Sequence, residues 1–214
     1  PIAAIPPNLI VNDRLRDRSV FAAQSEVALA ALGPCVVAAW NDGGEGGGNG
    51  IGWGWSADGG ASWRDGGAPP VGGGLGIWLT DPVLAVDEKR GTFYLGGVGI
   101  TSTARNAIAL VKGRFTGSTF AWEPPVLVRS VRDTLPDKPW IAADSLSGNV
   151  YLTYTSFFRA DGLFSDQVEL QRSTDGGVSW SPPAVLSSPA DRGLVQGGRP
   201  AGGPAGGVGG GGVA

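Results

Sequence analysis

Short apolar runs separated by glycine- and proline-containing turns recur along this chain. Three segments begin at Ser25, Asp81 and Asp137, each with an apolar run, a turn and a second, β-rich run. Their starting points lie 56 residues apart on both occasions (81 − 25 and 137 − 81). A short connection with a glycine near its end is typical of a β-hairpin, and no segment shows helical periodicity. The pattern therefore predicts repeated units of antiparallel strands.

Each predicted unit continues with a third and a fourth strand. The third strands are expected at 51–56, 107–112 and 167–173. A short fourth strand is expected after Trp63, Trp122 and Trp180, before a proline-rich exit. Four antiparallel strands in each unit are typical of the blades of a β-propeller. A single β-sandwich would also have regular strands, but it would not repeat a tryptophan in register.

The most specific repeat is the pattern Ser-x-Asp-Gly-Gly-x-x-Trp, which occurs as SADGGASW at 56–63 and as STDGGVSW at 173–180. Trp122 lies midway between the two copies. In such a turn the aspartate accepts backbone N–H bonds, the serine closes the turn, and the glycines supply positive φ angles. The tryptophan ring then packs between sheets. We therefore expect a structural role for Ser56, Asp58, Gly59, Gly60, Trp63, Ser173, Asp175, Gly176, Gly177 and Trp180.

The alternative for these aspartates is catalysis or calcium binding. Neighbouring glycines offer no side-chain ligands, so a calcium ion would need oxygens from elsewhere in the chain. The structural interpretation is favoured for that reason.

The sequence thus predicts an all-β fold, a β-propeller of four-stranded antiparallel blades with about three blades present. We expect an N-terminal segment or partial preceding blade at 1–23 and blades at 24–80, 81–136 and 137–192. The start of a fourth blade at 193–214 degenerates into a glycine-rich tail without strands. Three blades do not close a propeller, so we expect a fragment. The tail is interpreted as a truncated or frame-shifted coding region, with a linker as the alternative.

Composition narrows the classes of partner and cofactor. The net charge is −3 and the basic residues do not cluster, which gives no reason to expect nucleic acid as a partner. No apolar run is long enough to span a bilayer. A single cysteine excludes an internal disulfide framework and a cysteine-based metal cluster, and no metal or cofactor is expected. The oligomeric state is left open.

Strand connectivity predicts where a binding site would lie. In an up-and-down blade, the 1–2 and 3–4 turns share one face, whereas the 2–3 loops and the links between blades share the other. The second face is expected to carry the starts of the inner strands and the loops 41–50, 99–106 and 156–166. It contributes the candidates Glu26, Asp81, Asp137, Lys138, Arg105 and Arg159. Alternatively, the two aspartates are turn formers and the two arginines are solvated loop charges.

The repeated motif resembles the Asp box, or BNR repeat, of the sialidase superfamily. The phrases DPVLAVDEKRGTFYLGG, DKPWIAADSLSGNVYLTYT and RSTDGGVSWSPPAVLS are similar to bacterial sialidase-like propellers, over about residues 24–198. The middle unit departs from this pattern, because GRFTGSTFAW lacks the aspartate. The resemblance implies a six-bladed propeller in a secreted or cell-surface bacterial protein. It also implies a glycoside hydrolase of the exo-sialidase type, acting on glycans.

The resemblance implies roles for individual residues as well. Sialidases bind the sugar carboxylate with three arginines, and they use an aspartate as acid/base and a glutamate-activated tyrosine as nucleophile. Asp81 and Asp137 are the catalytic candidates. The phrase that commonly carries the first arginine is absent, and Arg18 is the nearest candidate. The other arginines and the Tyr/Glu pair are expected beyond residue 214. Other Asp-box proteins are non-catalytic, so the alternative is a propeller that binds a glycan, a polysaccharide or a protein.

Overall fold

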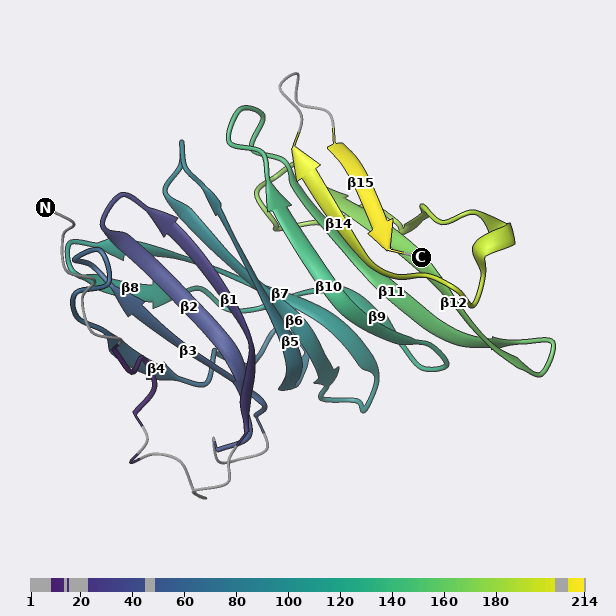
Figure 1. Ribbon diagram of the computed structural model, residues 1–214, viewed down its shortest axis with the longest axis horizontal. Coiled ribbons are helices and arrows are strands. Elements are labelled where there is room, and N and C mark those ends of the chain that lie inside the picture. Colours follow the sequence, from purple (N-terminus) through teal and green to yellow (C-terminus); the bar gives the residue numbers. More distant parts are fainter. Residues whose placement is uncertain (1–8, 14, 16–22, 45–48, 203–207, 214) are drawn as a thin grey trace, which may run out of the picture.

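The computed structural model describes residues 9–13, 15, 23–44, 49–202 and 208–213. These residues contain no α-helix, and none of their helical turns is long and apolar enough to cross a membrane. Three antiparallel sheets dominate the fold (Figure 1). The first contains β1 (Gln24–Leu32), β2 (Cys35–Asp42), β3 (Ile51–Ser56) and β4 (Arg64–Gly67) in that spatial order.

The second and third sheets repeat the same order. The second contains β5 (Leu75–Asp87), β6 (Thr92–Thr101), β7 (Asn106–Thr116) and β8 (Thr119–Trp122), and β9 (Val126–Val131) also pairs with β7. The third contains β10 (Leu135–Ala143), β11 (Val150–Ala160), β12 (Leu163–Ser173) and β13 (Ala184–Val185). A two-stranded sheet follows, with β14 (Gln196–Gly202) and β15 (Val208–Val213). The predicted all-β fold of four-stranded antiparallel units is therefore confirmed.

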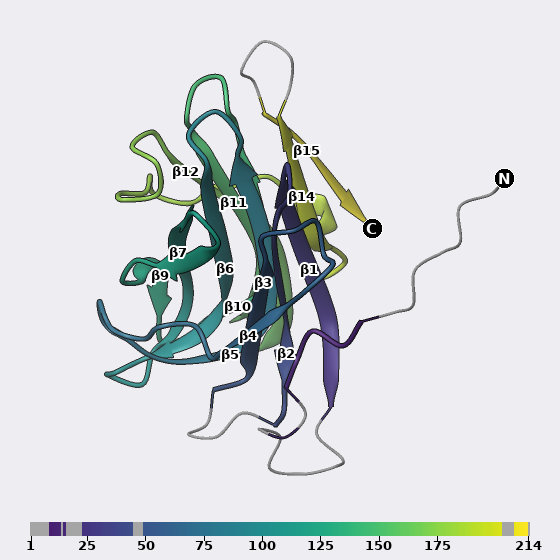
Figure 2. The same cartoon turned by 90° about the vertical axis from the view of Figure 1, so that its left-hand side faces the viewer.

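The first strand of each sheet lies next to the first strand of the following sheet. β1 lies beside β5, β5 beside β10, and β10 beside β14. The sheets consequently stand in a row, with β1 and β14 on one side of the molecule and β7 and β12 towards the other (Figure 2). The described sheets do not close into a ring, so the number of six blades stays a prediction.

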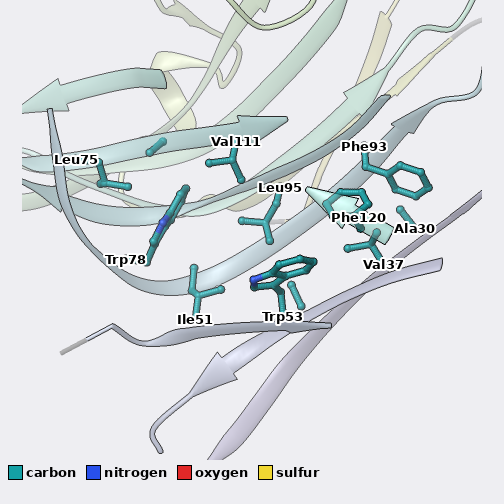
Figure 3. Packing of buried hydrophobic residues seen from close by; sticks show 12 residues of the cluster. Ala30, Val37, Ile51, Trp53, Leu75, Trp78, Phe93, Leu95, Val111 and Phe120 are labelled. Atoms are coloured by element: carbon teal, nitrogen blue, oxygen red, sulfur yellow. The ribbon is translucent and has the colours of Figure 1, made fainter. Parts of the chain in front are cut away.

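Buried side chains of the first and second sheets pack into one core (Figure 3). The Trp53 ring of β3 stacks on Trp55 with ring centroids 5.1 Å apart, and it meets Phe120 of β8 at 5.5 Å. Leu95 of β6 is fully buried in this core. Trp78 of β5 is also fully buried, and its indole N–H donates to the carbonyl oxygen of Pro70 at 2.9 Å. Because these anchors come from both sheets, neither sheet buries its apolar face alone.

A second core joins the second and third sheets. Tyr94 and Leu110 of the second sheet pack with Leu152 and Tyr154 of the third, and Trp180 packs against them. Trp180 follows β12, so the tryptophan at the end of the second repeated turn joins its sheet to the preceding one. Buried and exposed residues do not alternate along most of β6 and β11. Both strands are buried continuously instead, because other side chains cover both of their faces.

Two expectations about strand extent are wrong. The segment 156–166 is not a loop, because β11 and β12 continue through it as a hairpin in which Ala160 pairs with Leu163. The glycine-rich tail is not without strands, because β15 pairs with β14. Glycine lacks a side chain to pack, but its backbone N–H and C=O groups still pair with a neighbouring strand. The second unit also differs from its expected start, since β5 begins at Leu75 rather than at Asp81.

Candidate functional site

Each inner strand contains a bulge at an equivalent place. The pairing register shifts between Ser25 and Ala28 in β1, between Thr80 and Val83 in β5, and between Asp137 and Trp140 in β10. A bulge adds one residue to a strand and redirects a side chain. The bulge residues with positive φ are Glu26 at 52°, Asp81 at 58° and Lys138 at 47°. Such angles are uncommon for residues with a side chain, and they are often found at functional sites.

The three bulge residues form a cluster that joins three sheets. The Nζ atom of Lys138 lies 3.1 Å from Oε1 of Glu26 and 3.3 Å from Oδ2 of Asp81. The backbone N–H of Lys138 also donates to Oδ2 of Asp81 at 3.2 Å. The Thr80 hydroxyl donates to the other oxygen, Oδ1, at 2.8 Å. Glu26, Asp81 and Lys138 were all predicted on this face, and the structure brings them into contact.

Asn41 completes the cluster and was missed by the sequence reasoning. Its side-chain amide donates to Oε2 of Glu26 at 3.1 Å, and its amide oxygen accepts the backbone N–H of Asp81 at 2.8 Å. Asn41 lies near the end of β2, where an apolar run gives way to the polar pair Asn41-Asp42. That change of polarity is a signal for the end of a strand, but it does not reveal a bridge to the next sheet.

Neighbouring groups move the pKa values of two carboxyls in opposite directions. Burial opposes ionisation of Asp81, but Glu26, Thr80 and the positive charge of Lys138 together hold its pKa below the ordinary value. Burial and the negative charge of Asp81 raise the pKa of the adjacent Asp137. Asp81 is 7% exposed, so its charge depends on these partners more than on water. The arrangement provides one carboxyl that stays ionised and one that retains its proton to higher pH.

A cavity of about 800 Å³ opens beside this cluster. Residues of four inner strands line it: Glu26 to Leu29 of β1, Asp81 to Leu84 of β5, Lys138 to Ile141 of β10, and Gly197 to Arg199 of β14. Its wall combines apolar side chains with a few charged groups, the usual composition of a small-molecule site. A second hollow of about 590 Å³ is also lined by Lys138 and by Asp166, which accepts the backbone N–H groups of Gly193 and Val195.

The predicted arginines do not join the cavity. The guanidinium of Arg105 donates to the hydroxyl and carbonyl oxygens of Ser130, at 3.0 and 3.2 Å. It therefore fastens the β6–β7 turn to β9. Arg159 is exposed on the β11–β12 hairpin. Arg18 lies outside the described residues. Within the described ranges, the structure holds no group of three or more His, Cys, Asp or Glu placed to bind a metal ion.

The two SxDGGxxW turns lie at the other end of the strands. The Ser56 hydroxyl donates to Oδ1 of Asp58 at 2.7 Å and accepts the backbone N–H of Gly60 at 2.8 Å. Asp58 also accepts the backbone N–H of Ser62 at 2.8 Å. Bonds from Ser62 and Ser56 lower the pKa of Asp58 to about 2. The Gly59 N–H donates to Pro34 in the β1–β2 turn, far along β1 from Glu26.

The second turn repeats these bonds. The Ser173 hydroxyl donates to Oδ1 of Asp175 at 2.7 Å and accepts the backbone N–H of Gly177 at 2.8 Å. Bonds from Ser179 and Ser173 hold the pKa of Asp175 far below its ordinary value. Both aspartates are saturated by bonds inside their own turns. Neither lines the cavity, and a catalytic role for them has no support in this geometry.

Comparisons with known proteins identify the fold. No protein-family model matches the chain, and no curated protein matches it. Among solved structures, the chain resembles an α-L-arabinanase from Penicillium chrysogenum complexed with arabinobiose, with 17% identity and a TM-score of 0.60. It also resembles the GH93 α-L-arabinofuranosidase of Fusarium graminearum, with 19% identity and a TM-score of 0.61. A Hadza microbial sialidase matches with 16% identity and a TM-score of 0.57.

The matches cover most of this chain but only part of the other proteins. They include 91%, 90% and 83% of this chain, and 58%, 55% and 39% of the arabinanase, the arabinofuranosidase and the sialidase, respectively. The chain therefore shares the all-β fold of glycosidases, and this likeness supports the β-propeller architecture. At such identities the likeness concerns the fold alone.

Proposed function

We propose that this chain forms part of a glycoside hydrolase, with Asp81 and Asp137 as its catalytic carboxyls. The observation that carries the proposal is that Asp81 lines a cavity beside Asp137, and that the pKa values of these two carboxyls are moved in opposite directions. In most enzyme families, glycoside hydrolysis uses two carboxyls with different protonation states. The fold shared with glycosidases is consistent with it.

The two carboxyls would have different roles. Asp137 keeps its proton to higher pH, so it suits the general acid that protonates the departing glycosidic oxygen. Asp81 stays ionised, so it suits the base that activates water or the group that stabilises positive charge at the sugar ring. Lys138 and Thr80 hold Asp81 in place, and Asn41 positions its backbone. Each of these partners acts through Asp81.

We further propose an exo-acting enzyme of the sialidase type, which removes terminal sugars from glycans outside the cell or at its surface. In a sialidase-type reaction only one of the two aspartates would serve as acid/base, because sialidases use a tyrosine as nucleophile. The repeated SxDGGxxW turns support this assignment. The likeness to an arabinanase and an arabinofuranosidase makes arabinose-containing glycans the competing substrate. Fluorogenic α-sialosides and α-L-arabinofuranosides therefore form the two arms of the assay.

The test compares Asp81→Asn and Asp137→Asn with the wild type, each made as the natural protein that contains residues 1–214. Each substitution should lower kcat/KM by at least about a hundredfold, the usual contribution of a general acid or base. Asp133→Asn, which changes an exposed carboxyl in the β9–β10 turn, is the matched control and should leave kcat/KM unchanged. Hydrolysis of neither substrate by folded protein, or full activity of both variants, would remove the enzymatic proposal.

One observation favours a second candidate, a non-catalytic propeller that binds a glycan or a protein. Both oxygens of Asp81 already accept bonds, Oδ1 from Thr80 and Oδ2 from Lys138. A carboxylate engaged in this way can serve mainly to hold the bulges together. This candidate predicts glycan binding without turnover, which calorimetry on the same sugars would detect.

A further inference from the structure

Trp140 and Arg199 form a pair in the wall of the cavity, beyond the carboxylate cluster. Trp140 lies on β10 and Arg199 on β14, two strands that run side by side in Figure 1. The Arg199 Cζ atom lies over the indole ring, 4.1 Å from its centroid. Both residues line the same cavity as Glu26, Asp81 and Lys138.

The exposure of Trp140 is unusual for its type. Its side chain is 38% exposed, whereas Trp40, Trp53 and Trp78 are buried in the core. Tryptophan offers a large, rigid apolar surface, and its exposure in a cavity wall costs hydrophobic free energy unless a ligand covers it. Val27 and Leu29 of β1 line the same cavity at 72% and 59% exposure. The wall beyond the cluster is therefore apolar and, apart from the part of Trp140 under Arg199, exposed.

Arg199 supplies hydrogen-bond donors at the same place. A guanidinium stacked on an aromatic ring is held flat, and its N–H donors remain available at its edge. No carboxylate of the described residues lies within ion-pair distance of Arg199, and no described acceptor receives a bond from its side chain. An apolar ring surface beside guanidinium donors that no described acceptor engages suits a sugar, which has a C–H face and a rim of oxygen acceptors.

The pair is also at a suitable distance from the cluster. A bulge lies between Asp137 and Trp140, so these positions of β10 advance only as far as two residues of the partner strand, roughly 7 Å. That distance is about the length of one sugar unit. A chain of sugars lying along β10 would place one unit at the carboxylates and the next unit at Trp140.

We propose that Trp140 and Arg199 form a subsite for a second sugar unit, next to the unit held at Asp81 and Asp137. The part of the Trp140 ring that Arg199 leaves exposed contacts the C–H face of that unit, and Arg199 donates to a pair of its oxygens. The subsite deepens the proposed glycoside hydrolase function and rests on it for the position of the first unit. It makes the protein select glycans of at least two units over free monosaccharides.

Calorimetric titration of two sugar pairs tests the subsite: arabinobiose against arabinose, and 3′-sialyllactose against sialic acid. In at least one pair, the wild type should bind the longer sugar more tightly. Trp140→Ala should weaken binding of the longer sugar about tenfold while leaving the monosaccharide unchanged. Trp140→Phe keeps a ring and should recover most of the loss. Arg199→Gln should weaken the longer sugar several-fold, and Arg199→Lys should not restore it, because an ammonium lacks the planar donor fork.

Two control variants separate this effect from a general loss of stability. Phe164→Ala removes a 67%-exposed aromatic ring on the β11–β12 hairpin, and Arg64→Gln removes an exposed guanidinium on β4. Both should bind the sugars as the wild type does. Equal affinity of Trp140→Ala and wild type for the longer sugar would overturn the subsite, as would a failure of both longer sugars to bind. Failure of the hydrolase proposal looks different, since the longer sugar then binds but is not cleaved.

Discussion

Asp81 is held by groups from three sheets, two of them at its carboxylate and one at its backbone N–H. Thr80 belongs to its own strand, Asn41 to the first sheet, and Lys138 to the third. An isolated carboxylate at 7% exposure would tend to retain its proton, because burial disfavours the charged form. Its neighbours reverse that tendency, and the nearby Asp137 then carries the opposite shift.

This pair predicts the pH dependence of hydrolysis. Activity should fall as the pH drops through the lowered pKa of Asp81, because the ionised form is lost. It should also fall as the pH rises through the raised pKa of Asp137, because the acid loses its proton. Lys138→Met removes a positive charge beside Asp81 and should move the acidic limb of the kcat/KM profile to higher pH. If the acidic limb of Lys138→Met lies at the same pH as that of the wild type, Lys138 does not control the pKa of Asp81.

The aspartates of the SxDGGxxW turns predict a pH dependence of stability. The pKa of Asp58 falls from its ordinary value of 3.8 to about 2 in the folded protein. The contribution of Asp58 to the stability of the fold is therefore fully present at pH values above its ordinary pKa. It is lost as the pH falls through the pKa of Asp58 in the folded protein. Asp58→Asn should lower the melting temperature near neutral pH, and the difference from the wild type should shrink below about pH 2. Thermal unfolding followed by circular dichroism measures both, with Asp133→Asn as the exposed control.

At the scale of elements, the hydrophobic pattern predicted the strands better than their ends. The third strand of the first sheet has the bounds expected from the sequence, 51–56. For the β11–β12 hairpin the sequence predicts a loop, because its tip carries polar and glycine residues that also occur in loops. The apolar residues Phe157, Phe158 and Phe164 in that segment fit a strand equally well. The segment forms a hairpin because its two halves pair with each other. The sequence of one segment does not reveal such pairing.

The core between the first two sheets predicts a large effect of cavity formation. Leu95 of β6 is fully buried among side chains of both sheets. Leu95→Ala should lower the free energy of unfolding by about 3 kcal/mol, because the lost contacts are only partly recovered by collapse. Urea unfolding measures this change. Leu146→Ala, at a position that is 69% exposed, should change it by less than about 0.5 kcal/mol. Equal effects at the two positions would contradict the assigned core.

At the scale of the whole molecule, the candidate site is assembled from residues far apart in sequence. The Lys138–Glu26 bond joins positions separated by 112 residues. The repeat made this association predictable, because equivalent strand starts meet on one face of neighbouring blades. Glu26, Asp81 and Lys138 are all among the predicted candidates, but the sequence does not show that they occupy equivalent bulge positions with positive φ. A bulge inserts a residue that hydrophobic alternation does not show.

Other members of the site were beyond prediction. Asn41 acts between sheets, and Arg199 lies in the segment expected to start a fourth blade, for which no site residue is predicted. Arg105 was expected to face a ligand, but Ser130 from a strand later in the chain binds its guanidinium. Local sequence identifies a charged loop residue, whereas its partner depends on how distant strands come together.

Ligand binding should stabilise the molecule as a unit, because the cavity touches the inner strands of all four sheets. A sugar at about a hundred times its Kd should raise the free energy of unfolding by about 2.7 kcal/mol. The melting temperature should rise in a single transition, measured by differential scanning calorimetry. Trp140→Ala needs a higher sugar concentration for the same rise. An unchanged melting temperature at saturation would show that the sugar does not bind in this cavity.

The repeated bulge has a consequence for how this scaffold can diversify. Positions 26, 81, 138 and 197 hold Glu, Asp, Lys and Gly, yet all four keep a positive φ. Glu26, Asp81 and Lys138 contact one another across the sheets, whereas Gly197 has no side chain and a Cβ there would meet open space beside the same cavity. Substitutions at position 197 would therefore add a group to the cavity wall while the contacts among the other three bulges remain. A library restricted to this position would be a compact route to new sugar specificities by directed evolution.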